Sequence, residues 1–319
     1  MDAVIRPHRD GDDEAVVMVL DHSFPQLPRE GVEGYQHRVR RQGKEGLELR
    51  RFVAEVQGAV VGASFILRVP TDEPDIYFLD VTVVPDHRHR GIGSAMAAGL
   101  LQQAQDFGAR TLLAEISADE PYAMAFIAKH GFEPNGRGEQ LARLDVEAAN
   151  LDGFEDAEAT LGRQNLRIEL MKDLDLEDPD LLQSLYRLDM DTHRDIPSSV
   201  EWKDISLDEF WESIVNGPGR SPEWAWVALD GTVPVGVARL RVFPDGKALN
   251  AYTGTRSDYR GRGIARALKN RTVQWCREHG IRWVYTGNEV ENHRMLAINR
   301  SLGYEPLPRS IEVVRHLKS

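Results

Sequence analysis

Cysteine, long apolar runs and positive charge are scarce in this sequence. Its 319 residues contain one cysteine, Cys276, which excludes an intrachain disulfide and a cysteine-rich metal site. The net charge of −12 argues against a nucleic-acid-binding protein, because such proteins normally carry a basic face. No apolar run reaches the roughly eighteen residues of a membrane span, and residues 1–7 lack the apolar core of a signal peptide. We therefore expect a cytoplasmic protein without nucleic-acid or membrane partners.

The chain is built from a repeated unit. The loop 260–265, RGRGIA, stands between a strand-like run over 249–255 and a helical run that continues to residue 279. The loop 88–93, RHRGIG, has the same setting 172 residues earlier, and the pairs Gly131-Phe132 and Gly303-Tyr304 are also 172 residues apart. A spacing that is kept from one landmark to the next indicates duplication. The length suits two domains of about 150 residues each.

Both loops have the chemistry of a phosphate-binding turn. Where a strand stops and a helix starts, the first N–H groups of the helix lack intrahelical partners, and the helix dipole favours an anion there. Glycines at 91, 93, 261 and 263 remove Cβ atoms, so that a pyrophosphate can approach the backbone. Arginines at 88, 90, 260 and 262 add positive charge within an acidic chain. We expect a phosphate-bearing ligand in these loops.

Two well-known nucleotide-binding motifs fit the loops less well. A dinucleotide fingerprint needs a third glycine, but Met96 and Leu268 occupy that register. A P-loop needs Gly-Lys-Ser/Thr, which neither loop contains. A glycine-rich turn with solvated arginines would account for one loop. Two loops with matching flanks favour a ligand site instead.

The pattern Arg-x-x-Gly-x-Gly/Ala, followed later by a Gly-Phe or Gly-Tyr pair, resembles the GNAT family of acyl-CoA-dependent N-acetyltransferases. Both halves show it, so the chain resembles a tandem GNAT protein. The resemblance implies acetyl-CoA as cofactor, with its pyrophosphate on the loop and its pantetheine along the preceding strand. In the second half the implied contacts are Thr253, Gly254, Thr255, Arg260, Gly261, Arg262, Gly263, Ile264, Ala265, Asn288 and Asn292. In the first half they are Val81, Thr82, Val83, Arg88, His89, Arg90, Gly91, Ile92 and Gly93.

Acetyl transfer to an amine needs a deprotonated amine, donors for the developing oxyanion and a proton for the leaving thiolate. Backbone N–H groups at 81–83 and 253–255 can supply the donors. Many GNAT proteins carry an acidic tyrosine four residues before the Gly-Phe pair, where this chain has Asn299 and Ile127. The family's asparagine seven residues earlier is Asn292 in the second half and Glu120 in the first. Asn299 is a candidate catalytic residue that either bonds the cofactor or caps local backbone.

The general base is less clearly marked than the phosphate loops. GNAT proteins often place a glutamate on the fourth strand, but residues 247–255 contain no carboxylate. Glu289, after the fifth strand, and Tyr252, on the fourth, are the candidates. The alternatives are a solvated loop acid and a core aromatic residue. Asp80 is the counterpart of Tyr252 in the first half, and the ten histidines lack metal-ligand spacing, so no metal is expected.

Alternating strands and helices with one β-meander in each half predict an α/β fold. We expect two tandem GNAT-like domains, each with a mixed, mostly antiparallel sheet flanked by helices. The expected boundaries are 1–147 for the first domain, 148–164 for a linker and 165–319 for the second domain. Residues 141–146 are expected to close the first sheet.

The expected function is acetyl-CoA-dependent N-acetylation of a small-molecule primary amine, by direct transfer in the second half. The first half is expected to be the degenerate copy, because it has lost both family residues. Segment 189–206, with Asp189, Asp191, Asp195 and Trp202, would suit an ammonium group. Two rivals remain: a non-catalytic acyl-CoA-binding or sensing protein, and an acetyltransferase for protein lysines or N-termini. We expect a monomer or homodimer.

Overall fold

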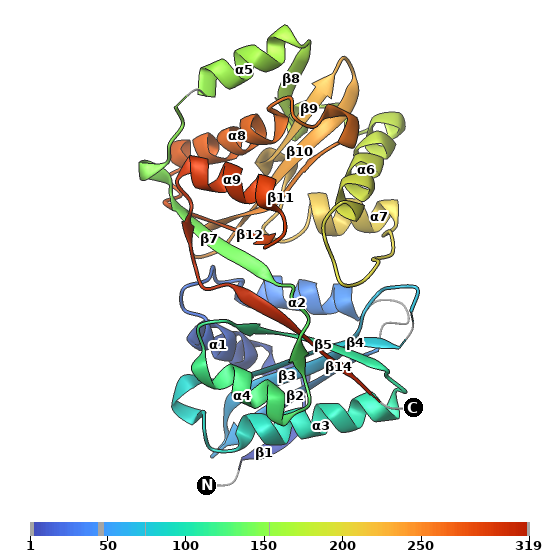
Figure 1. The fold of residues 1–319 in the computed structure, drawn as a ribbon, viewed down its shortest axis with the longest axis vertical. Coiled ribbons are helices and arrows are strands. Elements are labelled where there is room, and N and C mark those ends of the chain that lie inside the picture. Colours follow the sequence, from blue (N-terminus) through green and yellow to red (C-terminus); the bar gives the residue numbers. More distant parts are fainter. Residues whose placement is uncertain (1–2, 44–47, 74, 153, 318–319) are drawn as a thin grey trace. The chain divides into compact units, whose positions relative to one another are not determined.

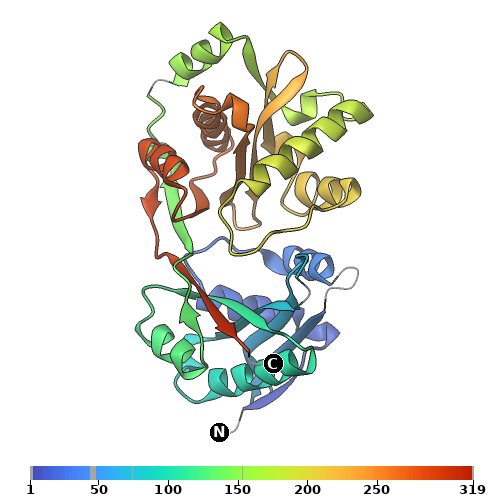
Figure 2. The same cartoon turned by 45° about the vertical axis from the view of Figure 1, so that its right-hand side comes forward.

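The computed structural model describes residues 3–43, 48–73, 75–152 and 154–317. The chain forms two compact units, and each unit contains one mixed seven-stranded sheet flanked by helices (Figures 1 and 2). Unit 1 comprises residues 1–139, 199–203 and 308–319, and unit 2 comprises residues 140–198 and 204–307. The predicted fold class is therefore confirmed.

The sheet of unit 1 has the strand order β1-β2-β3-β4-β5-β14-β6. Val53 and Ala54 are neighbours on β2 and point to opposite faces, Val53 towards α1 and Ala54 towards α3, as the two-residue period of a strand requires. The described elements are β1 (Val4–Pro7), α1 (Asp13–Ser23), α2 (Gly31–Gln42), β2 (Leu49–Val56), β3 (Ala59–Arg68), β4 (Ile76–Val83), α3 (Ile92–Asp106), β5 (Thr111–Ser117), α4 (Pro121–Lys129), β6 (Glu133–Pro134) and β14 (Ser310–His316).

The sheet of unit 2 has the order β13-β7-β12-β11-β10-β9-β8. Val227 of β9 packs in the cluster beneath α6, and its neighbour Ala228 packs beneath α8, so these two helices cover opposite faces. The described elements are β7 (Glu139–Asp145), α5 (Phe154–Arg163), β8 (Leu166–Leu170), α6 (Pro179–Arg194), α7 (Leu207–Glu209), a π-helical turn (Phe210–Val215), β9 (Ala225–Asp230), β10 (Val233–Val242), β11 (Ala248–Thr255), α8 (Ile264–Glu278), β12 (Trp283–Glu289), α9 (His293–Leu302) and β13 (Glu305–Pro306).

The last strand of each half lies in the other unit's sheet. β14 pairs with β5 along its whole length, from Ser310↔Ser117 to His316↔Thr111. β7 lies between β12 and β13 in unit 2, so the expectation that residues 141–146 close the first sheet is wrong. The apolar alternation of these strands is similar, and alternation alone does not specify a partner strand.

The compact units also differ from the expected linker. Within residues 148–164, α5 packs its Leu161 into the core beneath α8, so this segment belongs to unit 2; residue 153 lies outside the described residues. Residues 199–203 belong to unit 1, where Trp202 forms a β-bridge with Thr71 and Lys203 N–H donates to Pro70 O over 3.1 Å. Within the described ranges, no helix combines the length and apolar character needed to cross a membrane.

Candidate active site

The two central parallel strands of each unit separate soon after they begin to pair. Among the described residues, β11 pairs with β12 at Ala248↔Val284 and Leu249↔Tyr285, although β11 continues to Thr255 and β12 to Glu289. In unit 1, β4 and β5 pair from Ile76↔Thr111 to Phe78↔Leu113, and both strands continue beyond. The backbone of residues 253–255, and of 81–83 in unit 1, therefore faces an opening between diverging strands. This is the position expected for these cofactor-binding residues.

The loop after β11 ends in an open helix start. Gly261 has φ +77° and Gly263 has φ +87°, and a Cβ built on either would meet no atom within 4 Å. The first helical bond at this start runs from Ala267 N–H to Gly263 O over 3.1 Å, so the three preceding N–H groups lack an intrahelical acceptor. These donors and the helix dipole favour an anion at this place.

The corresponding loop in unit 1 has the same backbone shape. Gly91 has φ +84°, and Ala95 N–H donates to Gly91 O over 3.0 Å. His89 adopts φ +60° at the position of Gly261, a conformation that costs a side chain other than glycine of order 1 kcal/mol. A Cβ built on Gly93 would lie 3.6 Å from the ring of Phe126 on α4.

The first arginine of each loop holds the end of the preceding strand. Arg88 Nε donates to Val83 O over 2.9 Å, and Arg260 Nε donates to Thr255 O over 3.1 Å. Arg262 donates to Asp258 O over 3.3 Å. These arginines fix the loop as well as supplying charge, a role that the sequence pattern did not predict.

The remaining bonds of these arginines differ between the units. In unit 1, Arg88 Nη1 donates to Tyr122 OH of α4 over 2.6 Å and lies 3.5 Å from Glu120 Oε1. The His89 ring contacts Tyr122 edge-on at 5.0 Å. In unit 2, Arg260 pairs instead with Asp195 at the end of α6. The loop of unit 1 is therefore tied to the start of α4, and the loop of unit 2 is tied to α6.

Two of the predicted residues meet at the end of β12. Asn299 of α9 is 4% exposed, and its Nδ2 donates to Asn288 Oδ1 over 2.7 Å. The buried Oδ1 of Asn299 has no hydrogen-bond partner among the described residues. Asn292 is the N-cap of α9, with its Oδ1 accepting from Met295 N–H over 3.2 Å. Glu289 is the last residue of β12.

Tyr252 lies on the opposite face, against α6. Its hydroxyl shares a hydrogen bond of 2.7 Å with Thr192 Oγ1, and burial raises its pKa above the ordinary value. The guanidinium of Arg239 lies 4.7 Å from its ring centroid. The structure therefore separates Tyr252 from Asn299, and the three predicted catalytic residues do not form one cluster of contacts.

His193 is a site residue that the sequence did not reveal. It is exposed near the end of α6, and its ring stacks on Tyr252 with centroids 5.5 Å apart. Desolvation lowers the pKa of His193, Arg239 lowers it further, and Asp189 opposes both. The apolar spacing predicts a helix only over 181–188, but α6 continues to Arg194. Helical spacing from Leu188 to buried Thr192 is the signal that would have extended it.

The carboxylates expected to meet an ammonium group already have arginine partners. Asp189 is 2% exposed and forms an ion pair of 2.5 Å with Arg239. Asp191 pairs with Arg194 at 2.8 Å, and Asp195 pairs with Arg260. Trp202 is 49% exposed but belongs to unit 1. In unit 1, burial raises the pKa of Asp80, which accepts from Thr82 Oγ1 over 3.1 Å.

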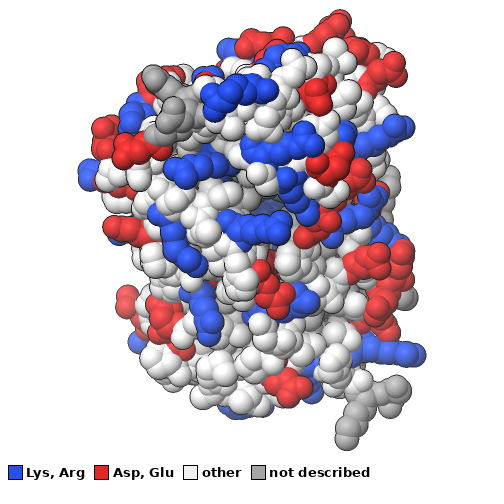
Figure 3. All heavy atoms as spheres, turned by 45° about the horizontal axis from the view of Figure 1, so that its top comes forward, with Lys and Arg blue, Asp and Glu red and all other residues white. Residues whose placement is uncertain are grey.

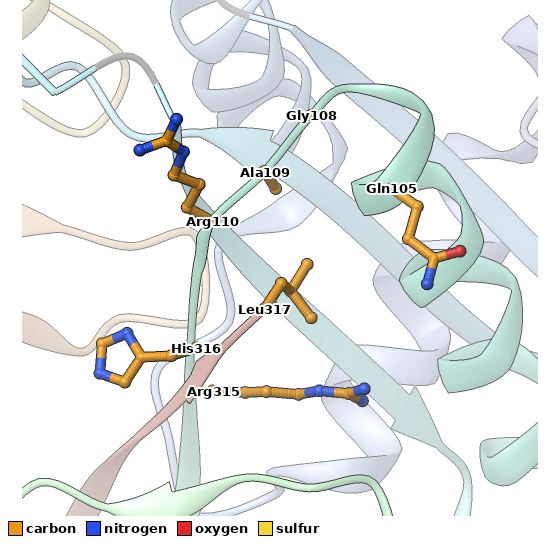
Figure 4. Close-up of a pocket in the computed structure, with 7 residues that line it drawn as sticks. All are labelled: Gln105, Gly108, Ala109, Arg110, Arg315, His316 and Leu317. Carbon is orange, nitrogen blue, oxygen red and sulfur yellow. The ribbon is translucent and has the colours of Figure 1, made fainter. Parts of the chain in front are cut away.

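A separate pocket in unit 1 contains none of the predicted residues. It has a volume of about 740 Å³ and lies between the ends of α3, β5 and β14 (Figure 4). Arg110, Arg315 and His316 line it. The phosphate loop lies at the other end of the fifteen-residue α3, roughly 20 Å away at 1.5 Å per residue. We therefore place the candidate active site at the diverging strands and not in this pocket.

Charge is unevenly distributed over the surface. On the face drawn in Figure 3, Lys and Arg side chains concentrate towards the middle, and most Asp and Glu side chains lie towards the margins. Among the described residues, no group of three or more His, Cys, Asp or Glu side chains has the arrangement of a metal site.

Diverging parallel strands beside an open, glycine-bearing helix start define an acyltransferase fold, and the chain belongs to the acetyltransferase (GNAT) family. The family model matches residues 17–132 and 182–304, one match in each half. A mycothiol acetyltransferase of Thermobifida fusca (strain YX) is 25% identical over 272 residues, covering 80% of this chain and 78% of that protein.

Solved structures show the same tandem arrangement. A tandem GNAT protein from the clavulanic acid biosynthesis pathway aligns with a TM-score of 0.72 and 18% identity, covering 100% of this chain and 99% of that one. A GCN5-related N-acetyltransferase from Sphaerobacter thermophilus aligns with a TM-score of 0.70 and 17% identity, covering 99% and 96%. The predicted tandem GNAT organisation and N-acetyltransferase class are thus confirmed.

Proposed function

We propose that unit 2 uses acetyl-CoA to acetylate a primary amine of a small molecule by direct transfer. The observation that carries this proposal is the combination, in unit 2, of an open helix start, diverging strands and a buried amide oxygen that has no partner among the described residues. The mycothiol acetyltransferase named above is a two-half relative and supports an acceptor of small-molecule size.

The residues of unit 2 fit an acyl-CoA. The N–H groups at the start of α8, above the two open glycines, would hold the diphosphate. The unpaired edge of residues 253–255 would bond pantetheine as a neighbouring strand does, and the orphan Oδ1 of Asn299 would accept one of its amide N–H groups. Coenzyme A supplies the acetyl group as a reactive thioester.

Unit 1 is the weaker candidate for cofactor binding. Its loop is bridged to α4 by the bond from Arg88 to Tyr122, and the His89 ring lies against the same tyrosine. A diphosphate with its chain running past α4 would have to break these contacts. We therefore assign one acyl-CoA site to each chain, in unit 2, and a structural role to unit 1.

The acceptor amine approaches from the α6 face, because the carrier begins on the α8 face. His193 is exposed there and stacks on Tyr252, one residue before Thr253. A lowered pKa keeps its imidazole neutral near pH 7, the form that takes a proton from an ammonium group. Tyr252 stays protonated and acts as a support for this ring, and Glu289 is the second candidate base.

The remaining catalytic requirements are met by position. Backbone N–H groups of residues 253–255 would stabilise the developing oxyanion. The Asn299 amide does not release a proton, so its proposed role is to orient the carrier. Holding the amine against the thioester supplies a large part of the rate enhancement in such reactions.

The experiment mixes the full chain with acetyl-CoA, a panel of small primary amines, a lysine peptide and a thiol reagent. The proposal predicts thiol release that depends on a small amine. Release with the peptide alone would identify a protein acetyltransferase.

The rival function is acyl-CoA binding without catalysis. It is favoured by Asn299, because a buried amide replaces the proton-donating tyrosine of many GNAT proteins. Tight binding of coenzyme A without thiol release across the whole panel would support this rival and overturn the catalytic proposal.

A further inference from the structure

Lys269 is a lysine buried in the core of unit 2 without a carboxylate. It lies on α8, it is 1% exposed, and its Nζ donates to Asn250 Oδ1 over 3.3 Å. Its aromatic neighbour is Tyr304, whose ring centroid is 5.4 Å from Nζ. No described carboxylate forms an ion pair with it, and desolvation lowers its pKa to about 7. A buried amine in this state costs folding free energy, which requires a compensating role.

Asn250 joins this lysine to the cofactor strand. Its Oδ1 also accepts from Thr253 Oγ1 over 2.9 Å, and its Nδ2 donates to Thr272 Oγ1 over 3.0 Å. Thr272 Oγ1 in turn donates to Lys269 O over 2.8 Å. We call these four residues, Lys269, Asn250, Thr253 and Thr272, the polar clamp. The clamp connects α8 to β11 at the point where β11 reaches its proposed cofactor contacts.

The clamp sits at a β-bulge. Arg239 and Leu240 are neighbours on β10, but they pair with Tyr252 and Asn250, so Ala251 is an extra residue in β11. The bulge turns Tyr252 towards α6 while Asn250 points towards α8, whereas in a regular strand both would share one face. The orientation of the residues after the bulge therefore depends on how the bulge is held.

Unit 1 shows that the fold itself does not need a clamp. The equivalent strand pair runs from Gly62↔Val83 to Arg68↔Tyr77 without a bulge. Matching the pairs Ile66↔Leu79 and Leu240↔Asn250 makes Leu79 the counterpart of Asn250. The counterparts of Lys269 and Thr272, 172 residues earlier, are Ala97 and Leu100, which are 8% and 0% exposed. Unit 1 is thus apolar at each of these places.

We propose that Lys269 and Asn250 are positioning residues that hold the β11 bulge so that residues 253–255 present their backbone to the acyl carrier. This inference rests on the proposed function of unit 2. It assigns a role to a buried charge that unit 1 replaces with alanine.

The test compares Lys269→Met with a control on the same buried face of α8. Cys276 is 0% exposed and does not bond to the clamp, so Cys276→Ala perturbs the core without touching it. Thermal unfolding, hydrogen exchange of residues 251–255 and binding of coenzyme A by native mass spectrometry are measured for each. For amine turnover, the Michaelis constants for acetyl-CoA and for the amine are measured separately.

The clamp predicts that stability and cofactor binding move in opposite directions. Lys269→Met should be at least as stable as the wild type, yet residues 251–255 should exchange faster. Its affinity for coenzyme A should fall by about tenfold, the factor for one lost hydrogen-bonded contact, and its Michaelis constant for the amine should not change. Asn250→Leu should have the same binding defect, and combining both substitutions should add little.

Two results would overturn the inference. One is unchanged exchange of residues 251–255 together with wild-type affinity in Lys269→Met. The other is a parallel loss of stability and binding, as expected for Cys276→Ala, which would mean an ordinary core role. If wild-type protein binds no coenzyme A, the proposed function fails, and the exchange measurement still decides whether the clamp holds the bulge.

Discussion

Replacing Lys269 with methionine should stabilise unit 2 near neutral pH and lose that advantage in alkaline solution. The ordinary pKa of a lysine is 10.5, and burial lowers that of Lys269 to about 7. Between these two values the unfolded chain holds a proton that the folded chain has released. The stability of the wild type therefore rises with pH across this window, and its deficit is largest below about pH 7.

The size of the effect follows from the same two values. The difference of 3.5 units, 10.5 − 7, corresponds to a maximal penalty of about 5 kcal/mol, and to about 4 kcal/mol at pH 7, where half of the buried amines are charged. Losing the hydrogen bond to Asn250 offsets about 1 kcal/mol of this gain. We expect Lys269→Met to be about 3 kcal/mol more stable than the wild type at pH 7 and slightly less stable at pH 10.5.

The assay is urea unfolding followed by tryptophan fluorescence between pH 6 and pH 10.5. Five of the six tryptophans lie in unit 2, so the signal reports mainly on this unit. A stability difference that does not change with pH would refute the reasoning, because it would mean that Lys269 has the same protonation in the folded and unfolded chain.

Three further predictions concern the site and the exchanged strand. Gly263→Val should weaken coenzyme A binding by tenfold to a hundredfold, roughly, because a β-branched residue is strained at φ +87°, whereas Gly91→Val should leave turnover unchanged. His193→Gln should lower kcat by about a hundredfold and remove the loss of activity at acidic pH; that loss should lie below the ordinary histidine pKa, because the folded-state pKa of His193 is lowered. Val313→Asp, at a position that is 0% exposed on β14, should increase hydrogen exchange of β5 but not of β12.

Each of these predictions has a contradicting outcome. Equal loss of turnover from Gly263→Val and Gly91→Val would remove the assignment of unit 2 as the working half. A His193→Gln enzyme with the pH profile of the wild type would eliminate this imidazole as the base. Faster exchange of β12 in Val313→Asp would mean that β14 does not belong to the sheet of unit 1.

The repeat and the phosphate loops were predictable because their signals are local. A strand, a glycine turn and a helix start occupy consecutive residues, and the same order occurs twice. The positive φ angles of Gly91 and Gly263 then follow from the turn geometry. Element boundaries such as β4 and α3 were close to expectation for the same reason.

Strand exchange was not predictable from such signals. β14 and β7 carry similar alternation, and the pairing of Val313 with Pro134 and Ala114 joins residues far apart in sequence. The energetic preference comes from the neighbouring strands in the folded sheet, which a sequence pattern does not contain.

The bulge was hidden by compensating changes in length. Its extra residue, Ala251, and a loop shortened by three residues leave a net difference of two between the units, which the sequence spacing shows as 174 changing to 172. The spacing alone predicts one two-residue change in that loop. The pairing resolves it into two events, and the second of them places Asn250 against Lys269.

The most direct test of the central claim is a count of coenzyme A molecules bound to the full chain by native mass spectrometry, combined with hydrogen exchange to locate them. We predict one molecule per chain, with protection appearing at residues 253–265 and not at residues 81–93. No bound molecule, or protection confined to residues 81–93, would contradict the claim.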